Sequence, residues 1–244
     1  MIIIDKYYTG NLRELFAEAT SNEIFLLVNK PKDWTSFDVV AKIRNTIRVK
    51  KIGHAGTLDP LASGLLIMAI GKATKKIDSM QAIDKNYIAT IKLGATTKTF
   101  DLESDEENPI DASKVNKSDI ENVLKDLRGV IRQTPPLYSA KKIKGQRMYV
   151  YARKNEEVEI PEIEITVNNI EILEYENTML KLDINCSKGT YIRTIANDIG
   201  KKLGVGGYLS DLVRDSIGEY KLENALELDD FLRIFRETPL LEVL

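Results

Sequence analysis

Residues 53–64 read Gly-His-Ala-Gly-Thr-Leu-Asp-Pro-Leu-Ala-Ser-Gly, and this stretch decides how the rest of the sequence is interpreted. Its glycines and its one proline surround a single carboxylate, Asp59. Pro60 favours extended backbone at Asp59, and Gly53 and Gly56 allow the backbone to approach another surface closely. An ordinary alternative is that Asp59 caps a short helix beginning at Pro60. The local pattern alone favours that alternative.

The composition is that of a folded, nearly neutral protein. The 244 residues include 35 Lys and Arg and 37 Asp and Glu, for a net charge of −2, and 43% of the residues are hydrophobic. Such a chain can bury a sizeable core, which excludes a disordered class. The longest apolar run is 65–70, and Asp5 and Lys6 interrupt the apolar N-terminus. We therefore expect no membrane span and no signal peptide.

The single cysteine and the single histidine limit the possible chemistry. Cys186 alone cannot form an internal disulfide, and one cysteine with one histidine, His54, cannot build the usual zinc sites. We expect no metal and a reducing cytoplasm. Any Ser-His-Asp triad or Cys-His pair would have to use His54. Carboxylate chemistry remains open.

Positive charge is concentrated in two segments. Residues 30–51 carry seven Lys and Arg against two Asp, a local charge of +5, and residues 132–154 carry seven Lys and Arg, no acid and three tyrosines. Basic residues interleaved with aromatic rings are typical of surfaces that bind nucleic acid. A solvated basic surface is the plainer alternative, and charge alone favours it.

Apolar residues at helical spacing predict three helices, over residues 36–48, 118–127 and about 190–203. Thr35 and Ser36 can cap the first, and Ser118 with Glu121 forms an expected capping box for the second. Arg193 lies in the first turn of the third helix, off its apolar stripe.

Strand patterns fall between these helices, over residues 25–28, 65–70, 87–93, 163–173 and 180–186. Strands and helices do not alternate strictly, so we expect an α+β fold with a mixed or antiparallel sheet. Pro135 and Pro136 cannot continue a ladder, and the basic residues after them lack a core stripe. Residues 132–154 are therefore predicted to be an inserted, mobile arm.

The loop at 53–64 resembles the signature of the TruB-type tRNA pseudouridine synthases, in which Gly-His-x-Gly-Thr-Leu-Asp-Pro-x-Ala-x-Gly carries the catalytic aspartate. The resemblance extends over about residues 24–220 and is far more specific than the loop alone. The other blocks that resemble the family are Asn29-Lys30-Pro31 with Thr35-Ser36, Lys85-Asn86-Tyr87 with Leu93-Gly94, Tyr138-Ser139-Ala140 with Lys142, Gly145, Arg147 and Tyr149, and Cys186-Ser187-Lys188-Gly189-Thr190-Tyr191-Ile192-Arg193.

The resemblance implies the pseudouridine synthase fold, with a central mixed, mostly antiparallel sheet flanked by helices, in a single catalytic domain over 1–244. It implies an isomerase, a tRNA pseudouridine-55 synthase, which acts on a flipped-out uridine in the T loop and needs no cofactor. Many relatives continue into a C-terminal PUA domain. Residues 221–244 are acidic and too short for one, so we expect that domain to be absent. We expect a monomer that binds the T arm of tRNA, with no membrane or protein partner.

Matched position by position, the resemblance makes Asp59 the catalytic nucleophile, Tyr87 the ring that stacks on the uracil, and Arg193 the partner of Asp59. An arginine would offset the rise in pKa that burial causes in a carboxyl group. An aromatic face would replace the stacking that a flipped base loses. Without the resemblance, a core tyrosine and a surface helix residue would be the preferred interpretations of Tyr87 and Arg193.

The resemblance assigns further residues to the substrate and the RNA. It places His54 against the RNA loop, Leu212 on the pocket wall and Lys30 in the substrate site, although core packing explains Leu212 equally well. It makes 132–154 a thumb that closes on RNA. The expected RNA-binding residues are Lys141, Lys142, Lys144, Arg147, Arg153 and Arg214.

The sequence departs from the family pattern at four positions. Asp33 and Ser104 stand where the family commonly has Gly, Lys98 where it often has Asp, and Tyr208 where many members have His. None of these changes removes a catalytic group. They put the local turn shapes and RNA contacts in question.

Two other functions fit parts of the sequence. A non-catalytic RNA chaperone that grips the tRNA elbow would explain the basic segments, but it would not require Asp59, Tyr87 and Arg193 together. A carboxylate-dependent hydrolase is disfavoured because no motif places a second acid. Whether Asp59 attacks the base or the sugar, and whether Tyr87 or a water removes the C5 proton, stays open.

Overall fold

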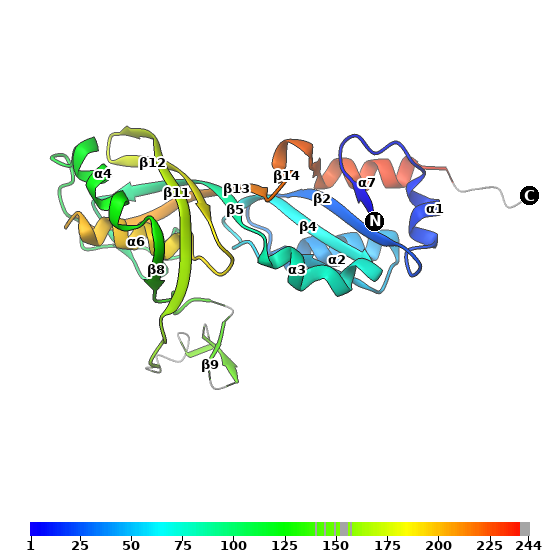
Figure 1. Ribbon diagram of the computed structural model, residues 1–244, viewed down its shortest axis with the longest axis horizontal. Coiled ribbons are helices and arrows are strands. Elements are labelled where there is room, and N and C mark those ends of the chain that lie inside the picture. Colours follow the sequence, from blue (N-terminus) through cyan, green and yellow to red (C-terminus); the bar gives the residue numbers. More distant parts are fainter. Residues whose placement is uncertain (140, 144, 149, 152–155, 157, 240–244) are drawn as a thin grey trace, which may run out of the picture. The chain divides into compact units, whose positions relative to one another are not determined.

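The computed structural model describes residues 1–139, 141–143, 145–148, 150–151, 156 and 158–239, and Figure 1 shows its strands and helices. It divides into two compact units. The first unit contains residues 1–86 and the segment that begins at Val213, and the second is Tyr87–Leu212. Both units contain strands and helices, which confirms the predicted α+β class.

The first unit is built on a mixed sheet. Its elements are β1 (Ile2–Ile4), α1 (Leu12–Ala17), β2 (Glu23–Lys30), α2 (Ser36–Ile47), β3 (Ile52–Ala55), β4 (Ser63–Gly71), the 3-10 helix η1 (Lys72–Lys76), α3 (Ile77–Ala82), β14 (Tyr220–Lys221), the 3-10 helix η2 (Leu222–Asn224), β15 (Leu226–Glu227) and α7 (Leu228–Glu237). β2 and β3 pair antiparallel with β4, whereas β1 and β15 pair parallel with β2.

Two hydrophobic clusters cover the sheet of the first unit. One contains alternate residues of β2 and β4 together with α1, α2 and α7, where the rings of Phe16 and Phe231 meet edge to face. The other contains the intervening residues of both strands, such as Phe25, together with Met80 of α3. Because β4 is buried on both faces, it carries a continuous apolar run at 65–70 rather than an alternating pattern.

The second unit also contains sheet strands. Its elements are β5 (Lys85–Leu93), β6 (Thr96–Thr97), β7 (Glu106–Glu107), α4 (Lys117–Asp126), β8 (Gly129–Gln133), β9 (Lys142–Ile143), β10 (Gln146–Arg147), β11 (Ile163–Glu176), β12 (Met179–Cys186), α6 (Ile192–Lys202) and β13 (Gly207–Ile217). The strand order is β13, β5, β12, β11, β8, and β11 runs antiparallel to both of its neighbours. The end of β13 belongs to the first unit, where Val213 and Arg214 pair parallel with Ser63 and Gly64 of β4.

The three predicted helices are confirmed as α2, α4 and α6, with small shifts at their ends. The hydroxyl of Thr35 caps α2 and accepts the backbone N–H of Asp38 at 3.0 Å. The predicted capping box of Ser118 and Glu121 is wrong. Helix α4 begins at Lys117, so Asn116 is the cap and Asp119 its partner, with the Asn116 N–H donating to the Asp119 carboxylate at 3.0 Å.

All five predicted strands are confirmed, as β2, β4, β5, β11 and β12, and each extends beyond its predicted bounds. Strand β13 and helix α7 were not predicted. Within the described part of the chain, no helix is long and apolar enough to cross a membrane.

The segment 132–154 begins with the last two residues of β8 and continues between β8 and β11. Its strands β9 and β10 form a hairpin separate from the main sheet. Met148 is buried and accepts a hydrogen bond at its sulfur from the Ser139 hydroxyl at 3.5 Å, so the segment buries side chains of its own. Residues 140, 144, 149 and 152–155 lie outside the described residues, and the mobility of the arm stays a prediction.

Candidate active site

The loop that carries Asp59 connects β3 to β4 in the first unit. Gly56 has a φ of 87°, which favours glycine, and the backbone C=O of Asp59 accepts the N–H of Ala62 at 3.1 Å. Pro60 therefore occupies the second position of a four-residue turn, where its fixed φ is suitable. Residues 56–62 contain no helix. The interpretation of Asp59 as a helix cap is thus wrong, and the glycines and proline shape a loop.

Lys30, at the end of β2, fixes this loop through hydrogen bonds to backbone oxygens. Its side chain is fully buried, and its ammonium donates to the backbone oxygens of Pro31 at 2.8 Å, Trp34 at 2.5 Å and Pro60 at 3.2 Å. The N–H of Asp33 donates to the same Pro60 oxygen at 2.9 Å. The carbonyl immediately after Asp59 is therefore held by two donors. Lys30 positions the loop through its backbone, and its assignment to the substrate site stays a prediction.

Burial lowers the pKa of Lys30 from 10.5 to about 8, while the negative charges of Asp59 and Asp33 act in the opposite direction. Between pH 8 and 10.5 the unfolded chain keeps a proton that the folded chain has released. The free energy of unfolding therefore rises with pH in this window, by about 3 kcal/mol for a shift of this size.

Replacing Lys30 should remove this pH dependence. We expect the wild-type protein to gain about 3 kcal/mol of stability relative to Lys30→Met as the pH rises through that window, measured by urea unfolding at several pH values. The matched control is Lys42→Met, at an exposed position of α2, which should follow the wild-type curve. Parallel pH curves for the wild type and Lys30→Met would contradict the assignment.

Arg214, near the end of β13, also holds the backbone of the loop, at residues other than those that Lys30 contacts. Its buried guanidinium donates to the backbone oxygens of Leu65 at 2.7 Å, Gly56 at 3.1 Å and Thr57 at 3.5 Å. Gly64 is required here, because a Cβ at that position would lie 2.4 Å from the Arg214 backbone oxygen. These contacts give Arg214 a positioning role in the loop, and its predicted contact with RNA stays a prediction.

Two polar side chains fix the remaining backbone of the loop. The hydroxyl of Ser36 accepts the N–H of Leu58 at 2.9 Å and donates to the Leu58 oxygen at 3.1 Å. The amide oxygen of Asn29 accepts the N–H of Gly64 at 3.1 Å. Both residues belong to the family-like block at 29–36, so this block supports the loop of Asp59.

His54 is the third residue of β3, close to the start of the loop that carries Asp59. Burial, and then the positive charge of Arg214, lowers the pKa of His54 below its ordinary value, although a hydrogen bond with the Gly56 backbone opposes this. Its Nδ1 is buried and has no hydrogen-bond partner among the described residues. The imidazole is therefore neutral at neutral pH. Its predicted place against the RNA loop is not tested by these contacts.

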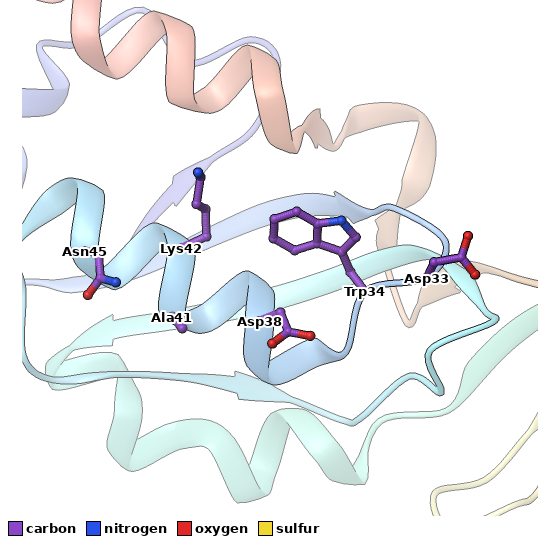
Figure 2. Close-up of a pocket in the computed structure, with 6 residues that line it drawn as sticks. All are labelled: Asp33, Trp34, Asp38, Ala41, Lys42 and Asn45. Carbon is purple, nitrogen blue, oxygen red and sulfur yellow. The ribbon is translucent and has the colours of Figure 1, made fainter.

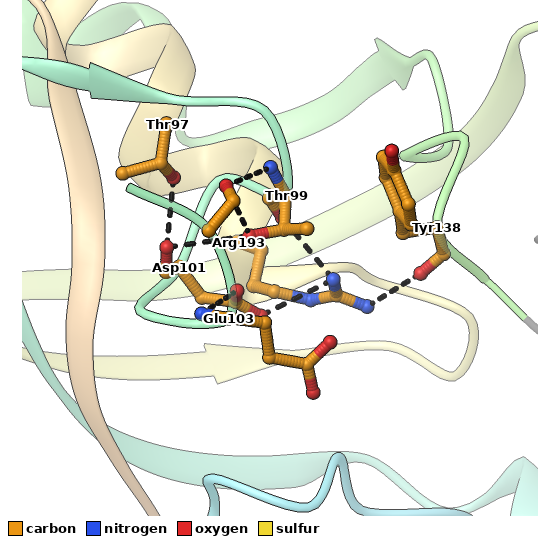
Figure 3. Close-up of polar contacts among 7 residues, drawn as sticks. Thr97, Thr99, Asp101, Glu103, Tyr138 and Arg193 are labelled. Carbon is orange, nitrogen blue, oxygen red and sulfur yellow. Dashed lines mark hydrogen bonds and ion pairs between the residues drawn. The ribbon is translucent and has the colours of Figure 1, made fainter. Parts of the chain in front are cut away.

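In the second unit, Arg193 is buried in the first turn of α6 instead of lying on the surface. Its Nη1 lies 3.2 Å from the Asp101 carboxylate and donates to the Thr99 oxygen at 3.1 Å. Its Nη2 donates to the backbone oxygen of Tyr138 at 3.1 Å (Figure 3). The guanidinium therefore links α6, the loop around Asp101 and the start of the arm. The predicted pairing of Arg193 with Asp59 stays a prediction.

The loop around Asp101 is itself tied by hydroxyl groups. The backbone oxygen of Asp101 accepts the hydroxyl of Thr97 at 2.8 Å, and the hydroxyls of Thr99 and Ser104 lie 3.0 Å apart. Phe100 has a φ of 63°, which is rare for a bulky residue and shows how tightly the loop is constrained. Sequence reasoning missed Asp101. Its signal was the threonine-rich run Thr-Lys-Thr-Phe-Asp at 97–101 that follows a predicted strand.

Tyr87 and Leu212 are both buried in the second unit, with exposed fractions of 8% and 7%. Tyr87 lies on the buried face of β5, which alternates with a half-exposed face along the whole strand. Burial of this kind fits core packing and a closed substrate pocket equally. The stacking role of Tyr87 and the pocket role of Leu212 stay predictions.

The predicted RNA-binding residues of the arm are only partly described. Lys141 is half-buried, and the backbones of Lys142 and Arg147 pair in the hairpin of β9 and β10. Lys144 and Arg153 lie outside the described residues. Their contacts with RNA stay predictions.

The departures from the family pattern have local explanations. Asp33 has a φ of 67°, the left-handed region in which glycine is common and aspartate is tolerated. Lys98 pairs with Glu107 at 3.0 Å, and the Tyr208 hydroxyl donates to Glu106. Ser104 forms the hydroxyl contact with Thr99. Each substituted side chain therefore finds a local partner or a permitted backbone conformation.

A pocket of about 390 Å³ lies along α2 and the residues before it in the first unit (Figure 2). Its lining residues are Asp33, Trp34, Asp38, Ala41, Lys42 and Asn45. Asp59 is not among them. With two carboxylates and one ammonium group, the pocket carries a net negative charge, so it is a poor site for a phosphate.

Known structures share this fold. A chain in the crystal structure of a Cbf5-Nop10-Gar1 complex superposes with a TM-score of 0.71 and 28% identity, covering 99% of this chain and 66% of that one. A chain in the structure of an H/ACA RNP bound to a substrate RNA containing 2'-deoxyuridine gives 0.66 and 25%, covering 97% and 67%. This chain therefore spans about two thirds of these structural relatives.

Residues 44–192 match the family model described as TruB family pseudouridylate synthase, N-terminal domain. The fold and the loop of Asp59 thus define a pseudouridine synthase, which is an isomerase. The tRNA pseudouridine synthase B of Parabacteroides distasonis is 48% identical over 216 residues, covering 85% of this chain and 92% of the relative. That of Clostridium tetani is 44% identical over 203 residues, covering 83% and 70%. The chain belongs to the TruB family.

Proposed function

We propose that this protein converts uridine to pseudouridine at position 55, in the T loop of tRNA, with Asp59 as the nucleophile. The observation that carries the proposal is the loop around Asp59, whose backbone is held by Lys30 and Arg214, in a chain that is 48% identical to a tRNA pseudouridine synthase B over 85% of its length. A rigid loop is required because a nucleophile must be held within reach of the reacting atom. The T arm of tRNA is the proposed binding partner. We also propose that the protein acts as a monomer in the cytoplasm.

The reaction needs a carboxylate and a closed pocket. The N-glycosidic bond breaks, the uracil turns while it remains bound, C5 bonds to C1′ of the ribose, the C5 proton leaves, and N1 takes up a proton. Asp59 supplies the electron pair that forms the covalent intermediate, on either the base or the sugar. Exclusion of water protects the detached uracil. The proposal names no cofactor, because each bond that breaks is balanced by one that forms within the nucleotide.

The remaining residues prepare the substrate. Tyr87 replaces the stacking that the flipped uridine loses, and Arg193 stabilises the ionised carboxylate of Asp59. The arm at 132–154 closes on the RNA. The contact between Arg193 and the Tyr138 backbone supports this role, because it ties the start of the arm to a residue that the proposal places in the active site.

The test is to map pseudouridine in RNA treated with the purified protein. We expect one new pseudouridine, at position 55, in a tRNA transcript and in an isolated T-arm stem-loop. A transcript with cytidine at that position is the matched control and should gain none. Pseudouridine at another position would overturn the proposed site, and its absence from both RNAs would overturn the proposed activity.

A further inference from the structure

Helix α2 carries an exposed aromatic ring beside one arginine, and a second arginine forms its C-terminal cap. Phe37, Ala41, Arg44 and Arg48 are spaced by four, three and four residues, so they form one line along the helix and its C-terminal cap, here named the α2 stripe. Phe37 is 63% exposed, and the guanidinium of Arg44 lies 6.0 Å from the centre of its ring. From Phe37 to Arg48 the line is roughly 16 Å long.

The positive charges of this region are not neutralised by the protein. Lys42, Arg44, Arg48, Lys50 and Lys51 have no ion-pair partner among the described residues. The Nε of Arg44 is buried and has no hydrogen-bond partner there either. By contrast, many surface cations elsewhere, such as Lys98 and Arg233, contact a carboxylate. A cluster of unneutralised cations favours a polyanionic partner.

The α2 stripe borders the pocket and shares Ala41 with its lining, but the two regions differ in charge. The pocket contains the carboxylates of Asp33 and Asp38 (Figure 2), and Asp38 is ionised because hydrogen bonds from Thr35 lower its pKa. The α2 stripe contains no acid along its length. Phosphates are therefore expected beside Arg44 and Arg48 and not beside the carboxylates of the pocket. An exposed phenyl ring beside these arginines fits a base or ribose face.

We propose that the α2 stripe is a second RNA-binding surface, separate from the loop of Asp59. Arg44 and Arg48 pair with two phosphates of the substrate RNA, and the ring of Phe37 stacks on an accessible base or ribose between them. The proposal rests on the proposed function, because it requires an RNA substrate. It adds a contact surface to which no catalytic role is assigned.

The test is the salt dependence of binding to a tRNA transcript, measured by filter binding at several salt concentrations. The double variant Arg44→Gln/Arg48→Gln should reduce the slope of log K against log salt by roughly 1.4 to 1.8, at 0.7 to 0.9 for each lost phosphate contact. Phe37→Ala should weaken binding roughly fivefold or more with the slope unchanged, and Phe37→Tyr should restore it.

The matched control is Lys117→Gln/Lys125→Gln, which removes two exposed charges from helix α4 of the second unit. Its slope should equal that of the wild type. A double variant of α2 that behaves like this control would overturn the inference, as would wild-type affinity in Phe37→Ala. Binding does not depend on turnover, so failure of the proposed reaction would show separately, as absence of pseudouridine with the wild-type protein.

Discussion

Asp59→Asn is expected to abolish pseudouridine formation while it leaves the fold and most of the RNA affinity intact. An amide keeps the shape of the side chain, but it has neither the charge nor the nucleophilic electron pair of a carboxylate. The turn around Asp59 depends on its backbone oxygen, which the substitution does not change. Affinity should stay within about tenfold of the wild type, because phosphate contacts dominate RNA binding.

The measurement is tritium released from carbon 5 of labelled uridine, with RNA affinity measured in parallel. Asp33→Asn is the matched control, because it makes the same chemical change nearby and asparagine tolerates the φ of 67° at that position. The control should retain activity. Turnover by Asp59→Asn or Asp59→Ala above that of a mock preparation would contradict the nucleophile assignment.

The sequence predicted the parts of the site that are local in the chain. Glycine, proline and aspartate at fixed spacing marked this stretch, although the local pattern alone favoured a helix cap at Asp59, and the structure has a turn there instead. The block at 29–36 was recognised only by resemblance. The structure shows what this block does: Lys30 and Ser36 form hydrogen bonds with the backbone of the residues on either side of Asp59.

The parts that depend on long-range contacts could not be predicted. Asp101 is separated from Arg193 along the chain by helix α4 and strands β7 to β12, and its sequence neighbourhood resembles an acidic surface loop. Arg193 lies off the apolar stripe of its helix, which indicated exposure, yet the Asp101 carboxylate compensates its burial. Helix α7 was missed because its acids hid the spacing of Leu228, Phe231, Leu232 and Phe235, which are all buried.

The buried ion pair of Arg193 and Asp101 makes Arg193→Lys the second substitution with a large expected effect. The planar guanidinium reaches the Asp101 carboxylate, the Thr99 oxygen and the Tyr138 oxygen together. A single ammonium keeps the charge but cannot point in these directions at once. Losing even two such contacts at about 1.5 kcal/mol each would lower activity by roughly a hundredfold or more.

This prediction is tested by single-turnover rates of Arg193→Lys at saturating RNA, together with its urea unfolding curve. Arg128→Lys is the matched control, because Arg128 is a partly exposed arginine of the same unit whose contact with Glu121 is 3.9 Å long. Its activity should change little. Asp101→Asn should resemble Arg193→Lys, since it leaves the buried guanidinium without its countercharge. Near-normal rates in Arg193→Lys would show that charge alone is needed there, and the three-way bridge between α6, the Asp101 loop and the arm would then have no part in catalysis.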